Sequence, residues 1–271
     1  MSFAHILRCD LSNRAKRYAE AQSLPHCLGY GASSVVCFEP FDNSLHGNFL
    51  PVSYKAIAAN PQWHRRLAKV HTSARRSLPR GGTRRWRELD SCTSSDALLM
   101  NVFCYPRVLA NVRAAGTLGL DTGLVPHFGF PARVPLENNR CDRTEVDMRL
   151  GDLLVEAKLT EGDFQRAEKV KVSRYRHFLD VFEEERLPQS ETHYDSYQLI
   201  RNVLAAHANR RSFCVLLDAR RPDLIEAFYA VVKCVKPVEL RTACRVLTWQ
   251  ELARVVPPKL QIFLAAKYGI K

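Results

Sequence analysis

The chain has 271 residues, of which 46% are hydrophobic and 25% charged, and this composition excludes a largely disordered protein. Lysine and arginine outnumber aspartate and glutamate by 40 to 28, so the formal net charge is +12. A surplus of this size predicts an anionic partner, most simply nucleic acid, with an anionic membrane surface as the alternative. No stretch approaches the roughly 18 uninterrupted apolar residues of a membrane span, so we expect no such span.

The nine cysteines are scattered, odd in number and without a CxxC pair. This pattern predicts free thiols in a reducing cytoplasm rather than a disulfide framework. Neither the cysteines nor the nine histidines show the spacing of zinc ligands.

The N-terminal third gives few clear elements. Residues 35–38 predict a short strand, and a helix is expected from Pro61 through Val70. Residues 64–87 hold nine lysines or arginines and no acidic residue. Pro79 and the Gly81-Gly82 pair prevent this basic segment from forming one continuous helix. We expect residues 1–87 to form an N-terminal extension of a core domain over residues 88–271.

From residue 93 onward, apolar periodicity and capping residues define the elements more clearly. In chain order the sequence predicts a helix over 93–104, strands near 134–137, 144–149 and 153–158, helices from about 163 to 208, a strand over 212–218, a helix over 222–235, a strand over 245–248, and helices from 249 and over 258–268. This alternation favours an α/β fold with a mixed central sheet flanked by helices.

The most informative segment is residues 145–158, which predict two strands joined by a tight turn at Gly151-Asp152. The register pairs Leu150 with Leu153 and sets Asp147 opposite Glu156. Alternation puts Val146 on the apolar face and the two carboxylates on the other. Like charges directly opposed at about 5 Å are destabilising, and a divalent cation would offset their repulsion. The alternative is an ordinary antiparallel pair with one apolar and one solvated face.

Asp147 followed by Glu156-Ala157-Lys158 resembles the metal-binding pattern of the PD-(D/E)XK nuclease superfamily, whose fold is restriction-endonuclease-like. The predicted order of helix, three-stranded meander, helix and strand is similar to the core of that superfamily over residues 88–250. The helix beginning Ser94-Ser95-Asp96-Ala97 and ending at Asn101 resembles the Ser-Ser-x-Ala-x-x-x-Asn helix of one uncharacterised bacterial branch. That branch usually has Gln where this chain has Asp96.

The resemblance implies a Mg²⁺-dependent (or Mn²⁺-dependent) phosphodiesterase, an endonuclease rather than an exonuclease. It implies metal ligation by Asp147, Glu156 and the backbone carbonyl of Ala157. Lys158 would orient or deprotonate the attacking water or stabilise charge on the phosphate, and Gln198 would help to position the nucleophile. A further acidic ligand is expected among Glu88, Asp96 and Glu137.

The helix after the second strand carries Tyr197, Gln198, Arg201 and Asn202, two i,i+4 pairs on adjoining stripes. We expect this helix and the basic segment to contact nucleic acid, with a solvated helix face and a solvated basic loop as the alternatives. The expected contact residues are Arg65, Arg66, Lys69, Arg75, Arg76, Arg84, Arg85, Arg87, Tyr197 and Arg201. Two further arginine pairs, Arg210-Arg211 and Arg220-Arg221, are typical of ordinary surface.

Other classes of function are weaker. Residues 29–36 resemble a glycine-rich nucleotide loop, but the chain has neither an HRD nor a DFG tripeptide, which excludes a protein kinase. The main rival is a nucleic-acid-binding protein that keeps the nuclease fold without cleaving. DNA is the expected substrate, RNA is the alternative, and a homodimer would suit cleavage of both strands of a duplex.

Overall fold

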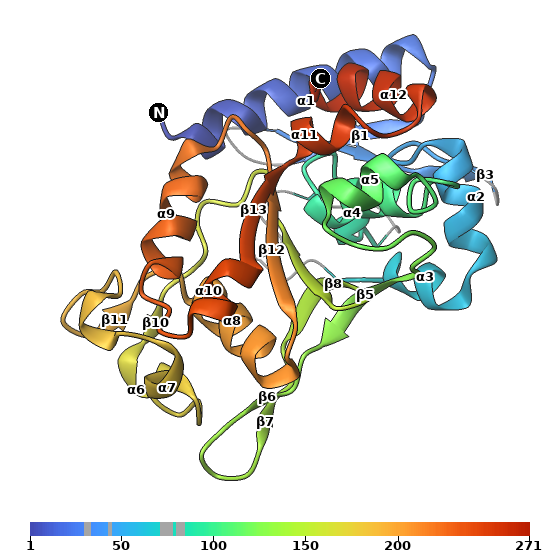
Figure 1. The fold of residues 1–271 in the computed structure, drawn as a ribbon. Helices are drawn as coiled ribbons and strands as arrows, with labels where there is room; N and C mark the ends of the chain where they lie inside the picture. Colours follow the sequence, from blue (N-terminus) through green and yellow to red (C-terminus); the bar gives the residue numbers. More distant parts are fainter. Residues whose placement is uncertain (30–33, 43–44, 71–77, 80–84) are drawn as a thin grey trace. The chain divides into compact units, whose positions relative to one another are not determined.

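The computed structural model describes residues 1–29, 34–42, 45–70, 78–79 and 85–271 (Figure 1). This part of the chain forms two compact units. The first comprises Met1–Pro126 and Trp249–Lys271, and the second comprises His127–Thr248. The boundary expected at residue 87 therefore falls inside the first unit. The C-terminal residues belong to this unit because helix α12 (Pro258–Tyr268) packs on the N-terminal helix α1 (Phe3–Ala21).

The first unit is mainly helical. Its other described elements are β1 (His26–Leu28), β2 (Val36–Phe38), β3 (Pro40–Asp42), β4 (Leu45–His46), α2 (Pro51–Ala59), α3 (Pro61–Arg66), the 3₁₀ turn η1 (Glu88–Asp90), α4 (Ser95–Phe103), α5 (Val112–Thr117) and α11 (Trp249–Ala253). Helix α1 was not predicted, yet it buries Leu7, Leu11, Ala15 and Ala19 at intervals of four residues. The side chain of Ser2 caps it by accepting a hydrogen bond from the His5 amide.

The second unit is built on a sheet with the strand order β13-β12-β9-β8-β5. These strands are β5 (Pro126–Pro131), β8 (Glu145–Leu150), β9 (Leu153–Ala157), β12 (Ser212–Leu217) and β13 (Cys244–Thr248). β12 is parallel to both β9 and β13, whereas β8 and β9 are antiparallel. The predicted mixed α/β sheet is confirmed.

Helices and short hairpins complete the second unit. They are β6 (Val134–Pro135), β7 (Cys141–Asp142), β10 (Ala167–Glu168), α6 (Lys169–Val172), α7 (Phe178–Val181), the 3₁₀ turn η2 (Glu184–Arg186), β11 (His193–Tyr194), α8 (Tyr197–Asn209), α9 (Pro222–Val232) and α10 (Val238–Ala243). Apolar side chains of α8, such as Leu199 and Val203, share one core cluster with Leu154 of β9 and Phe213 of β12. This packing fixes α8 against the sheet (Figure 1).

Two predicted elements differ in the structure. The first strand of the meander is β5, and not residues 134–137, because Val134 and Pro135 pair with Asp142 and Cys141 in a separate two-stranded hairpin. The continuous helix expected from about residue 163 is also wrong. Apolar side chains at helical spacing are present there, but two short helices, α6 and α7, and the β10–β11 hairpin occupy this stretch.

The C-terminal elements agree closely with those predicted from the sequence, and α12 spans the expected residues 258–268. Of the nucleotide-loop-like stretch at residues 29–36, residues 30–33 lie outside the described residues. Among the described helices, none is both long enough and apolar enough to cross a membrane.

Candidate functional site

The hairpin of β8 and β9 has the predicted register over three pairs, which do not include the expected pair of Asp147 with Glu156. Leu150 pairs with Leu153, Arg149 with Leu154, and Met148 with Val155. Beyond these pairs, the side chain of Asp147 connects β8 to β9, because its Oδ2 accepts a hydrogen bond of 2.8 Å from the amide of Ala157. Val146, expected on the apolar face, is buried and belongs to the core cluster that contains Leu154.

The polar side chains of β9 and of the residue after it are not solvated, whereas on β8 Glu145 is exposed and Asp147 is partly exposed. Glu156 is only 3% exposed and Lys158 only 5%. All five residues of β9 are buried, because α8 covers the face that carries Leu154 and Glu156. β8 keeps the alternation of an ordinary half-solvated strand, whereas β9 departs from that alternative because both of its faces are covered.

Lys158 lies at the centre of the site. Its Nζ is 2.9 Å from Oε1 of Glu156 and donates a 2.8 Å hydrogen bond to Oε1 of Gln198. Phe164 contributes its ring face, with the centroid 5.6 Å from Nζ. Protein groups thus offset the charge of Glu156, so repulsion between the two carboxylates does not by itself require a cation.

The ion pair shifts the pKa values of both partners. Burial alone would raise the pKa of Glu156, but the charge of Lys158, followed by that of Arg201 and by hydrogen bonds, holds it below its ordinary value. Burial alone would lower the pKa of Lys158, but Glu156, followed by Glu161 and Asp147, raises it above its ordinary value. At neutral pH the site therefore contains a carboxylate and an ammonium group.

The loop after β9 positions α8. The first amides of α8, at Tyr197 and Gln198, donate to the backbone carbonyls of Gln165 and Phe164, both at 2.9 Å. No side chain caps α8. The two loop carbonyls take the place of a cap, because they accept hydrogen bonds from N–H groups in its first turn. The helix thereby begins where Gln198 reaches Lys158.

The two stripes of α8 have different surroundings. Gln198 contacts Lys158, and one turn later Asn202 donates a 2.9 Å hydrogen bond to Oε2 of Glu156. Tyr197 and Arg201 are buried in the free chain, with Arg201 only 4% exposed. Their expected role as nucleic-acid contacts is therefore not supported. The hydroxyl of Tyr197 is instead 2.8 Å from that of Tyr175.

The three additional acidic candidates lie outside the β8–β9 hairpin, and their role as a further ligand stays a prediction. Glu137 is exposed and lies after β6, outside the meander that was expected to carry it. Glu88 and Asp96 belong to the first unit. There Lys69 pairs with both carboxylates, at 3.0 Å from Glu88, and Arg66 lies 3.1 Å from Asp96.

This ion-pair cluster changes the interpretation of the basic segment. Arg66 and Lys69 neutralise buried carboxylates within the protein. Arg65 and Arg85 are exposed, and Arg87 donates to the carbonyl of Ala68. Contact of these three with nucleic acid stays a prediction. Arg75, Arg76 and Arg84 lie outside the described residues.

The buried Asp96 makes stability depend on pH. Burial would raise its pKa, but Lys69 and then Arg66 hold it below the ordinary value. A depressed pKa contributes stability above about pH 4 that is lost as the pH falls through the lower folded value. We expect Asp96→Asn to lower the free energy of unfolding by about 3 kcal/mol at pH 7. Denaturant titrations should show this difference shrinking below pH 4.

Asp10→Asn is the matched control for Asp96→Asn. Asp10 pairs with Arg14 at 2.8 Å on the same unit, but about one third of each side chain is exposed. Loss of such a surface pair should cost about 0.5 kcal/mol or less. Equal effects of the two substitutions at pH 7 would contradict the buried-pair explanation.

The donor set of the site suits a hard divalent cation. Mg²⁺ takes oxygen ligands and is usually bound by one or two carboxylates plus water and substrate phosphate. Asp147, Glu156 and the Ala157 carbonyl supply that number, and each carboxylate oxygen retains a lone pair after accepting one hydrogen bond. No cluster of three or more histidine, cysteine, aspartate or glutamate residues in the described part of the chain could hold a metal ion. The protein ligands of a metal ion at the hairpin would therefore be Asp147, Glu156 and the Ala157 carbonyl.

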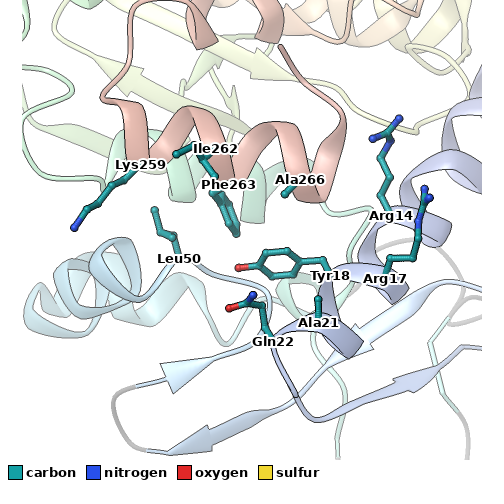
Figure 2. Close-up of a pocket in the computed structure, with 10 residues that line it drawn as sticks. All are labelled: Arg14, Arg17, Tyr18, Ala21, Gln22, Leu50, Lys259, Ile262, Phe263 and Ala266. Carbon is teal, nitrogen blue, oxygen red and sulfur yellow. The ribbon is translucent and has the colours of Figure 1, made fainter.

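A hollow of about 500 Å³ in the first unit is a poorer candidate. It lies between α1 and α12, with Tyr18 and Phe263 facing each other in its interior (Figure 2). Its lining includes Arg14, Arg17 and Lys259 but no carboxylate. It has the wrong donor set for a divalent cation.

Two residues important to the site were not predicted. Asn202 was noted only as part of a helix stripe, and its four-residue spacing from Gln198 was the available signal. Arg221, expected on the surface, is completely buried and donates to the carbonyls of Glu161 and Gly162 at 2.6 and 3.1 Å. It thereby fixes the loop that follows Lys158, and no sequence pattern indicated this.

The mixed sheet, the covering helix and the Asp147, Glu156 and Lys158 group together define a protein of the restriction-endonuclease-like class. More specifically, the chain belongs to the family described as restriction endonuclease associating with ARP, whose model matches residues 12–269. Family membership indicates a nuclease-like function. No curated protein and no solved structure matches the chain.

Proposed function

We propose that this protein is a Mg²⁺-dependent endonuclease that hydrolyses phosphodiester bonds in DNA at the β8–β9 hairpin. The observation that carries the proposal is the buried contact of Lys158 with both Glu156 and Gln198, at 2.9 and 2.8 Å. A solvated surface pair would not be enclosed in this way. The description of the family as a restriction endonuclease favours DNA over RNA.

Asp147, Glu156 and the carbonyl of Ala157 would hold the cation. When bound, it supplies Lewis acidity at the phosphate and lowers the pKa of water. In the reaction, water adds to phosphorus and one P–O ester bond breaks, giving a phosphate monoester and a hydroxyl group. Lys158, paired as an ammonium group with Glu156, would stabilise negative charge that develops on the phosphate oxygens. Gln198 orients the ammonium group by accepting a hydrogen bond from it.

The test is incubation of the full chain with circular duplex DNA, circular single-stranded DNA and RNA, each with Mg²⁺, Mn²⁺ or EDTA. We expect nicking or linearisation of circular duplex DNA with Mg²⁺ or Mn²⁺ and none with EDTA. Since a circle has no ends, cutting would also exclude a pure exonuclease. DNA binding without cutting under every metal condition would instead support the non-catalytic nucleic-acid-binding protein.

A further inference from the structure

Asn202 is fully buried, and its side chain forms hydrogen bonds with Glu156 and Arg201. Its Nδ2 donates to Oε2 of Glu156 at 2.9 Å. Its Oδ1 accepts from Nε and Nη2 of Arg201, at 3.1 and 2.8 Å. A guanidinium group only donates, so the oxygen of the amide must face Arg201 and the NH₂ group must face Glu156.

Arg201 extends this connection to the neighbouring strand. Its Nη2 also donates to the backbone carbonyl of Glu145 at 3.2 Å. Glu145 is the first residue of β8 and stands two residues before Asp147. Hydrogen bonds therefore run without interruption from the start of β8, through two consecutive residues of α8, to the carboxylate on β9.

Glu156 is consequently held at both oxygens. Nζ of Lys158, two residues further along the chain, lies 2.9 Å from Oε1, and Asn202 of α8 donates a hydrogen bond to Oε2. Rotation of the carboxylate about its last bond would break both contacts at once. The free chain thus fixes which lone pairs of Glu156 remain available.

We infer that Arg201 and Asn202 form a clamp that orients Glu156 relative to the start of β8 and thereby sets the ligand geometry for a divalent cation. The inference rests on the proposed function and deepens it. Neither residue touches the cation or the substrate in this account, so both are positioning residues. Partners of metal-ligating side chains typically contribute about 10- to 100-fold to metal affinity or activity.

The test is the affinity of the full chain for Mn²⁺ without DNA, measured by calorimetry for the wild type, Asn202→Ala and Arg201→Lys. We expect Asn202→Ala to weaken the affinity by about 10- to 100-fold. Arg201→Lys keeps the positive charge but loses the planar fork that reaches both Asn202 and Glu145, so a smaller loss is expected. This second variant also covers the case in which Asn202→Ala fails to fold.

Asn209→Ala is the matched control, because Asn209 lies on the same helix and donates to the backbone carbonyls of Ala132 and Ala205 at 2.9 and 2.7 Å. It should bind Mn²⁺ as the wild type does. A crystal structure of metal-free Asn202→Ala should show a rotated Glu156 carboxylate. Wild-type affinity in folded Asn202→Ala, with Glu156→Gln binding no metal, would overturn the clamp alone. A wild type that binds no Mn²⁺ would overturn the proposed function together with the clamp.

Discussion

Lys158→Met is expected to reduce metal-dependent DNA cleavage by about 10²- to 10³-fold, the usual effect of removing one donor that stabilises charge in a transition state. The reason is that Lys158 is the ammonium group enclosed between Glu156 and Gln198. The substitution keeps much of the aliphatic volume and removes the charge. The measurement is the single-turnover rate of plasmid cleavage at saturating Mg²⁺, with circular dichroism to verify folding.

Lys236→Met is the control for this prediction. Lys236 lies on the same unit, is exposed, and donates only to the carbonyl of Leu179 among the contacts described, at 2.7 Å. Its replacement should leave the cleavage rate unchanged. A folded Lys158→Met variant that cuts at the wild-type rate would contradict the assigned role of Lys158.

Arg221→Met is expected to destabilise the protein by about 3–5 kcal/mol, because a completely buried guanidinium is lost. Its Nη atoms donate to the carbonyls of Glu161 and Gly162, and its fork pairs with Asp223 at 2.9 and 2.8 Å. Water can reach the partly exposed Glu161 and the exposed Gly162, so the loss comes mainly from the buried guanidinium and the contacts of its fork. Denaturant unfolding of the wild type and the variant measures the difference.

Arg186→Met provides the comparison for Arg221→Met. Arg186 pairs with Glu183 at 2.7 Å, but its side chain is 58% exposed, so the pair should contribute about 0–1 kcal/mol. A loss in Arg221→Met no greater than that in Arg186→Met would show that the loop after β9 does not depend on the buried arginine.

The hairpin and its register were predictable because they rest on local rules. Alternation of side chains, a Gly-Asp turn and a buried apolar strand all pointed to the same pairing of Leu150 with Leu153. The placement of Gln198 near Lys158 could be expected from the order of elements in the PD-(D/E)XK nuclease superfamily, which the sequence resembles. The exact contact, however, depends on the loop carbonyls that fix where α8 begins.

What the sequence could not predict depends on long-range packing. Arg66 and Lys69 lie in a basic segment with no acidic residue, so nothing local indicated that they would be the counter-ions of the buried Asp96. Glu137 was misplaced because a two-residue strand at Val134–Pro135 has the same local pattern as a meander strand. Tyr197 and Arg201 were expected at the nucleic acid because helix periodicity identifies a stripe but not what covers it.

The carboxylates of the β8–β9 hairpin are proposed to support metal-dependent cleavage. The most direct test is the rate of plasmid cleavage as a function of Mg²⁺ concentration for the wild type and Asp147→Asn, an isosteric change that removes one ligand charge. We expect saturable, Mg²⁺-dependent cutting by the wild type and its loss in Asp147→Asn. Equal cutting by both proteins, or cutting by the wild type in EDTA, would contradict it.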